Sequence, residues 1–146
     1  MTGDVPAWAA EFLRAARVGR LATASGDGRP LVVPVCYVFD GALIYSAVDA
    51  KPKRTRELRR LRNIAENPPV SLVVDEWDED WARLRYVIVE GRADLLTDGA
   101  EFSLAIDLLV AKYPQYRTLG LPRDTGVVIR ITPDRILPWA YESPAP

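Results

Sequence analysis

Apolar residues recur every three or four positions in three stretches of the chain, a spacing that predicts amphipathic helices. The first predicted helix opens near Pro6 and ends at Gly19, which stands where a C-cap glycine is expected. The second begins near Pro52, and Asn67-Pro68-Pro69 ends it. The third follows Asp98, a favourable N-cap residue. Its predicted apolar face consists of Phe102, Ala105, Ile106, Leu109 and Tyr113.

Short apolar stretches rich in β-branched residues lie between these helices and predict strands. The expected strands cover residues 20–24, 30–39, 42–46, 70–74, 84–96, 127–131 and 136–140. Asp40-Gly41 is a strong hairpin signal, and Pro133-Asp134-Arg135 predicts a turn between the last two strands. Stretch 84–96 reads as one long strand or two short ones, with Gly91 marking a β-bulge. Stretch 70–74 has the apolar run of a strand buried on both faces, and residues 114–126 predict a loop.

The strands are joined in hairpins rather than through helices, so the sheet should be mainly antiparallel. The predicted fold class is therefore α+β, a small barrel or sandwich with helices at its margins. A chain of 146 residues is expected to form one domain over residues 1–142, followed by a loose tail at 143–146.

The second predicted helix carries a concentration of positive charge. Seven of the chain's nineteen Lys and Arg residues fall between Lys51 and Arg62. Four of them crowd the helix N-terminus: Lys51, Lys53, Arg54 and Arg56. Each cation is unfavourable there by a few tenths to about 1 kcal/mol unless an anion is present. Free N–H groups and several cations together form a phosphate site. The stretch therefore predicts an anion site, while a solvated arginine face remains the alternative.

Composition and charge exclude several functions. The chain has no histidine, which removes Ser-His and Cys-His nucleophile pairs and every His-based metal site. The net charge of −1 argues against a nucleic-acid partner, which usually requires a basic excess over a whole face. No apolar run approaches the roughly 20 residues of a membrane span, and no signal segment is evident, so a cytoplasmic location is expected. Cys36, the single cysteine, excludes an internal disulfide and is expected in the core.

Acidic residues dominate the segment 75–80, where five of six residues are carboxylates. The segment lacks the glycine and the ligand spacing of a calcium loop, so no metal site is expected. The favoured interpretation is a solvated turn with Trp77 or Trp81 packed inward. Paired carboxylates for acid/base chemistry remain an alternative, although no two of them stand out.

Pro34 lies in the middle of a predicted strand, where it cannot donate a ladder hydrogen bond. Two interpretations remain open. The strand is a simple edge strand, or the barrel opens here and a flat ligand lies against the backbone of residues 33–35.

These features in this order resemble the pyridoxamine-phosphate-oxidase-like superfamily of flavin-binding split barrels, over nearly the whole chain. The matching pieces are Gly19-Arg20-Leu21-Ala22-Thr23, Pro30-Leu31-Val32-Val33-Pro34-Val35, Leu43-Ile44-Tyr45-Ser46, Glu66-Asn67-Pro68, Val70-Ser71-Leu72-Val73-Val74 and Glu90-Gly91-Arg92-Ala93. Residues 51–68 followed by 75–85 are similar to one actinobacterial subgroup of oxidoreductases that use the deazaflavin coenzyme F-420.

The resemblance implies a homodimeric split barrel with two cofactor sites at the subunit interface. It further implies hydride transfer from coenzyme F-420 to a small electron-poor substrate. A hydrophobic patch involving Trp77, Trp81 or Trp139 would then be covered by the partner. Because the cofactor supplies the chemistry, no catalytic side chain is predicted.

The same resemblance implies the cofactor contacts. The residues expected at the ring are Val33, Pro34 and Val35 on one strand and Tyr45, Ser46 and Ala47 on another. Lys51, Lys53 and Arg54 are expected at the phosphate, and Trp139 near the site. Lys51-Pro52-Lys53 is longer and more basic than the Ser-Arg-Lys of flavin-mononucleotide (FMN) oxidases, which favours a cofactor with a phosphate and an acidic oligoglutamate tail. An FMN oxidoreductase and a non-enzymatic flavin or deazaflavin carrier are the alternatives.

Overall fold

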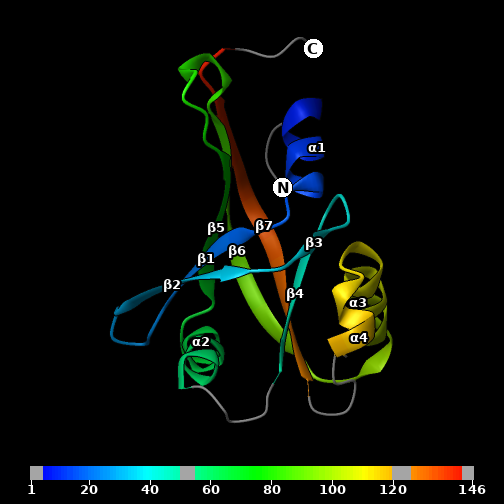
Figure 1. Ribbon diagram of the computed structural model, residues 1–146. Coiled ribbons are helices and arrows are strands. Elements are labelled where there is room, and N and C mark those ends of the chain that lie inside the picture. Colours follow the sequence, from blue (N-terminus) through cyan, green and yellow to red (C-terminus); the bar gives the residue numbers. More distant parts are fainter. Residues whose placement is uncertain (1–4, 50–54, 120–125, 143–146) are drawn as a thin grey trace.

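A single curled antiparallel sheet dominates the computed structural model, which describes residues 5–49, 55–119 and 126–142. Within these residues the sheet has seven strands in the order β2-β1-β5-β6-β7-β4-β3. The strands are β1 (Gly19–Ala24), β2 (Pro30–Val35), β3 (Val38–Phe39), β4 (Ile44–Asp49), β5 (Pro69–Glu76), β6 (Arg85–Leu96) and β7 (Gly126–Ala140). This arrangement confirms the predicted α+β class with a mainly antiparallel split barrel (Figure 1).

Four α-helices and one short 3-10 helix flank the sheet in the described part of the chain. They are α1 (Ala7–Ala15), α2 (Thr55–Glu66), α3 (Gly99–Lys112), α4 (Gln115–Leu119) and η1 (Trp81–Arg83). Helix α2 packs on β1 and β6 at one end of the barrel, and α3 packs on β3 and β4 (Figure 1). Helix α1 lies against β3 and β6 towards the opposite end.

The core occupies the inner face of the sheet, because side chains along each strand alternate between the two faces. Buried residues of this face include Leu21, Leu72, Val74, Val87, Val89, Ile129 and Ile131. Strand β5 follows this alternation, since Val70, Leu72 and Val74 are buried while Ser71 and Val73 are half-buried. The prediction that stretch 70–74 is buried on both faces is therefore wrong.

Residues 30–39 do not form one strand as predicted. Strand β2 ends at Val35, Cys36 and Tyr37 cross over, and β3 pairs with β4 at the other end of the sheet order. Tyr37 fills the core and its hydroxyl donates to the Leu13 carbonyl, which turns Cys36 outward. Cys36 is exposed rather than in the core, so that prediction is also wrong.

Residues 126–140 form one strand, not two strands separated by a turn. Strand β7 pairs with β6 from Arg85↔Ala140 to Leu96↔Val128, and the register shifts between Glu90 and Gly91. Asp134, which the sequence predicted in a turn, is the extra residue of β7 at this shift, because Glu90 pairs with Arg135 and Gly91 with Pro133. The shift confirms the predicted bulge at Gly91. One other prediction is wrong, because α4 occupies part of the predicted loop. Asp98 takes the N-cap position of α3 as predicted, and its side chain makes no cap hydrogen bond there.

Gly19 does not cap a helix. Helix α1 ends at Ala15, and Gly19 is the first, buried residue of β1. A Cβ atom at this position would lie 2.8 Å from Leu72 Cδ1, so the glycine permits close packing instead. The end of α2 at Glu66 confirms the stop at Asn67, whereas its predicted first residues lie outside the described residues.

We expect Gly91→Ala to lower the free energy of unfolding by about 2 kcal/mol or more. The added Cβ would lie 2.3 Å from the Thr132 carbonyl oxygen and 3.0 Å from Pro133 Cα, both backbone atoms of β7. Urea unfolding measures the change. Gly26→Ala is the matched control, because its Cβ would meet only the flexible end of Glu66 at 3.2 Å. Equal stabilities of the two variants would contradict this account of the bulge.

Candidate functional site

The two ends of the curled sheet meet at one point. The Ser46 hydroxyl donates a hydrogen bond of 2.7 Å to the carbonyl oxygen of Cys36, just after β2 ends. Strand β2 pairs with β1 on one side only, and β3 pairs with β4 only at Ile44 and Tyr45. Among the described residues no backbone ladder joins β2 to β4. A hydrogen bond therefore joins the end of β2 to β4 at Ser46, and the rest of β2 and β4 remain unpaired with each other. We call this opening between β2 and β4 the split, and it is the candidate cofactor site.

Six residues predicted at the ring lie on the two strands that border the split. On β2, Val33 and Val35 pack on the core while Pro34 is exposed on the edge strand. The edge position of Pro34 is therefore confirmed, and the second interpretation, a flat ligand against residues 33–35, stays a prediction. On β4, only Ser46 turns its side chain to the end of β2. Tyr45 and Ala47 instead pack beneath α3, in a cluster with Phe102, Ala105, Ile106 and Val128.

Tyr45 has a structural role in this arrangement. Its hydroxyl donates to Glu101 at 2.7 Å, and the Arg130 guanidinium bridges Glu101 at 2.7 Å and Asp94 at 3.1 Å. Burial, followed by the hydrogen bond to Glu101, raises the pKa of Tyr45 to about 12. The phenol therefore stays protonated at neutral pH and fixes β4 to α3, as expected for a structural tyrosine.

Trp139 lies far from the split within one chain. Strand β4 pairs with the segment of β7 that ends at Ile131, and Trp139 follows eight residues later, roughly 26 Å along the strand. Its ring stacks on Tyr86 with centroids 5.3 Å apart, and 40% of the residue is exposed. The chain does not bring Trp139 to the other predicted site residues.

The outer face of the sheet carries an apolar strip. Register places Val73, Ile88 and Leu137 side by side on β5, β6 and β7, next to the Tyr86–Trp139 stack. We call these five residues the outer strip. A shallow groove of about 500 Å³ opens over Val73, Tyr86 and Ile88, beside the Arg20–Asp75 ion pair. One of about 400 Å³ follows it towards Gly91 and includes the carboxylates of Glu90 and Asp134 in its lining.

The predicted phosphate ligands Lys51, Lys53 and Arg54 lie outside the described residues. The described part of the predicted basic helix is α2. A groove of about 460 Å³ lies between α2 and the β1–β2 turn. Three arginines line it: Arg29, Arg59 and Arg62. We call this the basic groove.

The β1–β2 turn holds the basic groove in shape. Asn63 is buried and donates to Thr23 Oγ1 at 3.1 Å, which fixes α2 to β1. Two carboxylates also line the groove, but each has a partner in the turn. Glu66 accepts from the Gly26 N–H at 3.2 Å, and Asp27 accepts from the Ser25 hydroxyl. Three guanidinium groups against two carboxylates leave the groove with a small net positive charge.

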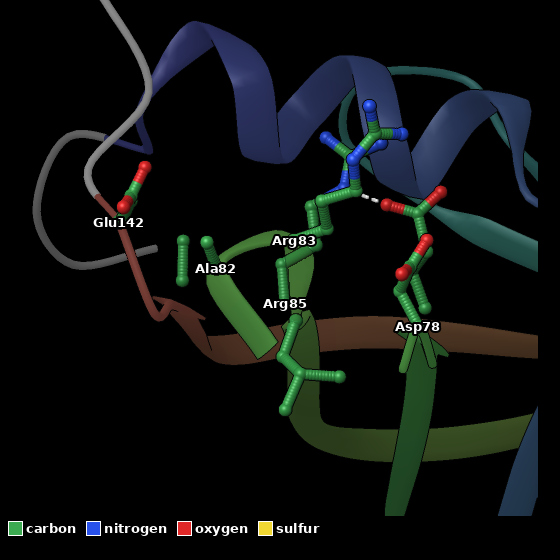
Figure 2. Close-up of a pocket in the computed structure, with 8 residues that line it drawn as sticks. Asp78, Ala82, Arg83, Arg85 and Glu142 are labelled. Atoms are coloured by element: carbon green, nitrogen blue, oxygen red, sulfur yellow. Dashed lines mark hydrogen bonds and ion pairs between the residues drawn. The ribbon is translucent and has the colours of Figure 1, made fainter. Parts of the chain in front are cut away.

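An acidic segment forms the opposite end of the molecule, at the β5–β6 hairpin. We call residues 75–85 the acidic tip. It borders a pocket of about 240 Å³, and Figure 2 shows Glu142, beyond β7, on one side of it and Asp78 on the other, with Arg83 and Arg85 between them. Trp77 and Trp81 are 66% and 60% exposed, so the prediction that one of them packs inward is wrong. The tip extends past the core, and the two rings pack edge-to-face on each other at 6.5 Å.

A buried polar cluster was not foreseen from the sequence, which gives no local signal for it. The Lys112 ammonium donates to the Ala16 carbonyl at 2.8 Å and lies 4.3 Å from the centroid of the Tyr37 ring. Burial, followed by repulsion from Arg17, lowers the pKa of Lys112 to about 8. The Tyr113 hydroxyl accepts from the Tyr37 N–H at 3.1 Å. These contacts join α3 to α1 and to the crossover, so the cluster is structural.

The described residues contain no group of three or more His, Cys, Asp or Glu side chains placed to hold a metal ion. None of the described helices is both long and apolar enough to traverse a lipid bilayer.

Comparison with known proteins assigns this arrangement to a family. A protein of Streptomyces rimosus, 5a,11a-dehydrotetracycline/5a,11a-dehydrooxytetracycline reductase, is 30% identical over 132 residues, which cover 90% of this chain and 80% of that protein. A crystal structure of a FAD-binding protein from Mesorhizobium loti is 30% identical with a TM-score of 0.66, covering 86% and 85% of the two chains. A structure described as an F420 reductase is 25% identical with a TM-score of 0.65, covering 91% and 98%. The model of the family "Pyridoxamine 5'-phosphate oxidase" matches residues 6–140. This chain therefore belongs to the pyridoxamine 5'-phosphate oxidase family, and its curled sheet is the flavin-binding, oxidoreductase-type split barrel of that family.

Proposed function

We propose that this protein is a cytoplasmic oxidoreductase that binds coenzyme F-420 and reduces a small electron-poor substrate. Similarity to a reductase of Streptomyces rimosus supports the reaction type. Similarity to an F420 reductase supports the cofactor. The observation that carries the proposal is the split between β2 and β4, which leads directly into the basic sequence before α2.

The groups around the split fit a flat ring with a charged substituent. The side of β2 turned away from β1 has no strand partner among the described residues, so its peptide groups are available to the polar edge of a ring. Pro34 contributes no N–H there, which leaves its carbonyl as the only backbone hydrogen-bonding group at that position. Ser46 fixes the end of β2 at the closed corner of the split.

The charge of the adjoining sequence favours F-420 over FMN. Lys51, Lys53 and Arg54 follow β4 directly in sequence and begin a run of seven cations within twelve residues. One FMN phosphate neutralises few of these charges. A phosphate together with an acidic oligoglutamate tail neutralises more of them, and charge-assisted contacts are the strong ones.

Bound F-420 in its reduced form supplies a hydride donor, and the chain's own residues supply position and environment. The strands at the split orient the ring, and the apolar side chains of Val33 and Val35 keep the adjacent core dry. No side-chain acid is assigned to the reaction. The pKa of Tyr45, raised to about 12, and its packing beneath α3 make it a positioning residue rather than a proton donor.

A flavin enzyme of the same fold is the second candidate. Similarity to a FAD-binding protein at 30% identity is the observation that favours it. A cofactor carrier without a substrate is the third, and multiple turnover with any acceptor would exclude it.

We further propose that the protein acts as a homodimer. The outer strip and the exposed Trp77 and Trp81 leave apolar surface uncovered on one copy, and a second copy is the occupant that the proposed site requires. Trp139 lies roughly 26 Å along β7 from Ile131, where the β4 ladder ends, and this separation within one chain favours a partner's Trp139 at the site.

We expect coenzyme F-420 to bind more tightly than FMN. Equilibrium titration followed by fluorescence measures both dissociation constants in the same buffer and salt. Equal or tighter binding of FMN would contradict the cofactor assignment and leave the fold unaffected.

We expect Lys53→Glu combined with Arg54→Glu to weaken F-420 binding at least about a hundredfold, because two charge-assisted contacts are lost and repulsion is added. Thermal stability should change little, since removing cations from a helix N-terminus relieves an unfavourable dipole interaction. The control is Arg117→Glu, which reverses one exposed charge on α4. If the double variant folds and binds F-420 like the parent, the phosphate site lies elsewhere.

Multi-angle light scattering should give the mass of a dimer at micromolar concentration with cofactor present. Ile88→Lys should shift the protein towards the monomer, because it places a charge in the middle of the outer strip. Val32→Lys is the control, since Val32 is already 64% exposed and lies outside the strip. A parent protein that remains monomeric would contradict the proposal.

A further inference from the structure

Lys112 differs from the other cations of the chain in its environment. The chain has sixteen arginines and three lysines, and the other two lysines, Lys51 and Lys53, belong to the basic sequence before α2. Lys112 lies in the last turn of α3. Its side chain is half-buried in the polar cluster between α3, α1 and the crossover, whereas most lysines in proteins are exposed.

Three groups surround the Lys112 ammonium. It donates to the Ala16 carbonyl at 2.8 Å and lies 4.3 Å from the centroid of the Tyr37 ring and 5.4 Å from that of Tyr113. These contacts favour the charged amine, but none of them supplies a full negative charge. No carboxylate lies within ion-pair distance of Lys112 among the described residues.

A second cation shares the Tyr113 ring. The Arg17 guanidinium lies 4.6 Å from the ring centroid. Arg17 is exposed and likewise has no ion pair within the described part of the chain. Two neighbouring positive charges repel each other, which favours loss of a proton from one of them. Because arginine keeps its charge at any ordinary pH, the proton is lost from Lys112.

The result is an amine that is partly neutral near physiological pH. Burial, followed by repulsion from Arg17, lowers the pKa of Lys112 to about 8, while the nearby Cys36 has the opposite effect. Burial raises the pKa of Tyr37 and of Tyr113, so both phenols stay neutral beside it. At pH 8 about half of the Lys112 amine is neutral, compared with roughly 0.3% of a lysine at the ordinary value.

We propose that Lys112 is a site of covalent acylation by anionic acyl donors of the acyl phosphate class. A neutral amine beside another cation is an activated nucleophile. Part of the Lys112 side chain is open to solvent, which gives a small donor access. The exposed guanidinium of Arg17 is well suited to bind the phosphate group of that donor.

The reaction is a transfer of the acyl group without oxidation or reduction. The lone pair of Lys112 Nζ attacks the acyl carbon, and an N–C bond forms. The bond between the acyl carbon and the phosphate oxygen breaks, and phosphate leaves with the electron pair. The proton of the amine passes to solvent. The Arg17 guanidinium stabilises the charge on the departing phosphate.

Acylation changes the contacts that hold α3. The product amide is uncharged, so the attraction of the ammonium to the Tyr37 and Tyr113 rings is lost. Tyr37 follows Cys36, whose carbonyl accepts from Ser46 at the corner of the split. The modification therefore lies next to the split without being part of it. This inference goes beyond the proposed function and does not rest on it.

Trace labelling with acetic anhydride tests the reactivity of Lys112 in the cofactor-free parent protein. Mass spectrometry of peptides measures the labelling of each lysine from about pH 6 to pH 10. Labelling of Lys112 should rise with a midpoint near pH 8 in the folded protein. In the urea-unfolded protein it should still be rising at about pH 10, because only the folded surroundings favour the neutral amine. Equal profiles in the two states would overturn the proposal.

Acetyl phosphate tests the class of donor. At pH 8 the rate of Lys112 acetylation by acetyl phosphate is divided by the rate with acetic anhydride, which is uncharged. This ratio should fall about threefold to tenfold in Arg17→Gln, because the guanidinium attracts only the anionic donor. Both reagents react with the same neutral amine, so a change in the pKa of Lys112 cancels in the ratio.

Arg83→Gln is the matched control, since it removes an exposed cation of η1 that lies outside the cluster. It should leave the ratio within about twofold of the parent. An unchanged ratio in Arg17→Gln, or acetylation by acetyl phosphate that modifies Lys51 and Lys53 but not Lys112, would overturn the proposal. The pH profile needs no substitution, so it tests Lys112 even if a variant fails to fold.

Discussion

The long ladder between β6 and β7 is the constraint on which the rest of the structure depends. It runs from Arg85↔Ala140 to Leu96↔Val128 and bends at Gly91, where a Cβ atom would collide with the backbone of β7. Because of this bend, the paired strands β6 and β7 extend from one end of the barrel to the other. One end carries the acidic tip, and the other carries β4 and the tie between Ser46 and Cys36. The distance between tip and split therefore follows from the length of this ladder.

Local patterns predicted the elements whose signals lie within the element itself. Helical spacing located α1, α2 and α3, the two prolines after Asn67 located the end of α2, and Gly91 located the bulge. Pro34 indicated an edge strand because a missing N–H limits pairing whatever the partner is. Each of these features is determined by residues within a single segment, so the local sequence pattern is enough to predict it.

The errors concern positions whose environment is set by a distant segment. Pro133 and Asp134 look like a turn, yet Gly91 on β6 admits them into a continuous β7. Cys36 looks like a core residue, but Tyr37 occupies the core beside it and leaves Cys36 outside. Within the candidate site, residues 33–35 and 45–47 do border one split, whereas Trp139 is remote from it in the same chain. Nothing local to Trp139 reveals that separation.

The position of β7 has a consequence for how the protein is made. Strand β7 is the last strand of the described chain, yet it lies inside the sheet between β6 and β4. During synthesis β4 must wait for β7, its partner 77 to 87 residues later in sequence, since Asp49 pairs with Gly126 and Ile44 with Ile131. Until then both β4 and β6 have unpaired edges, which are prone to intermolecular pairing. Folding is expected to be slow and dominated by long-range contacts, and a nascent chain stalled before residue 126 cannot close its barrel.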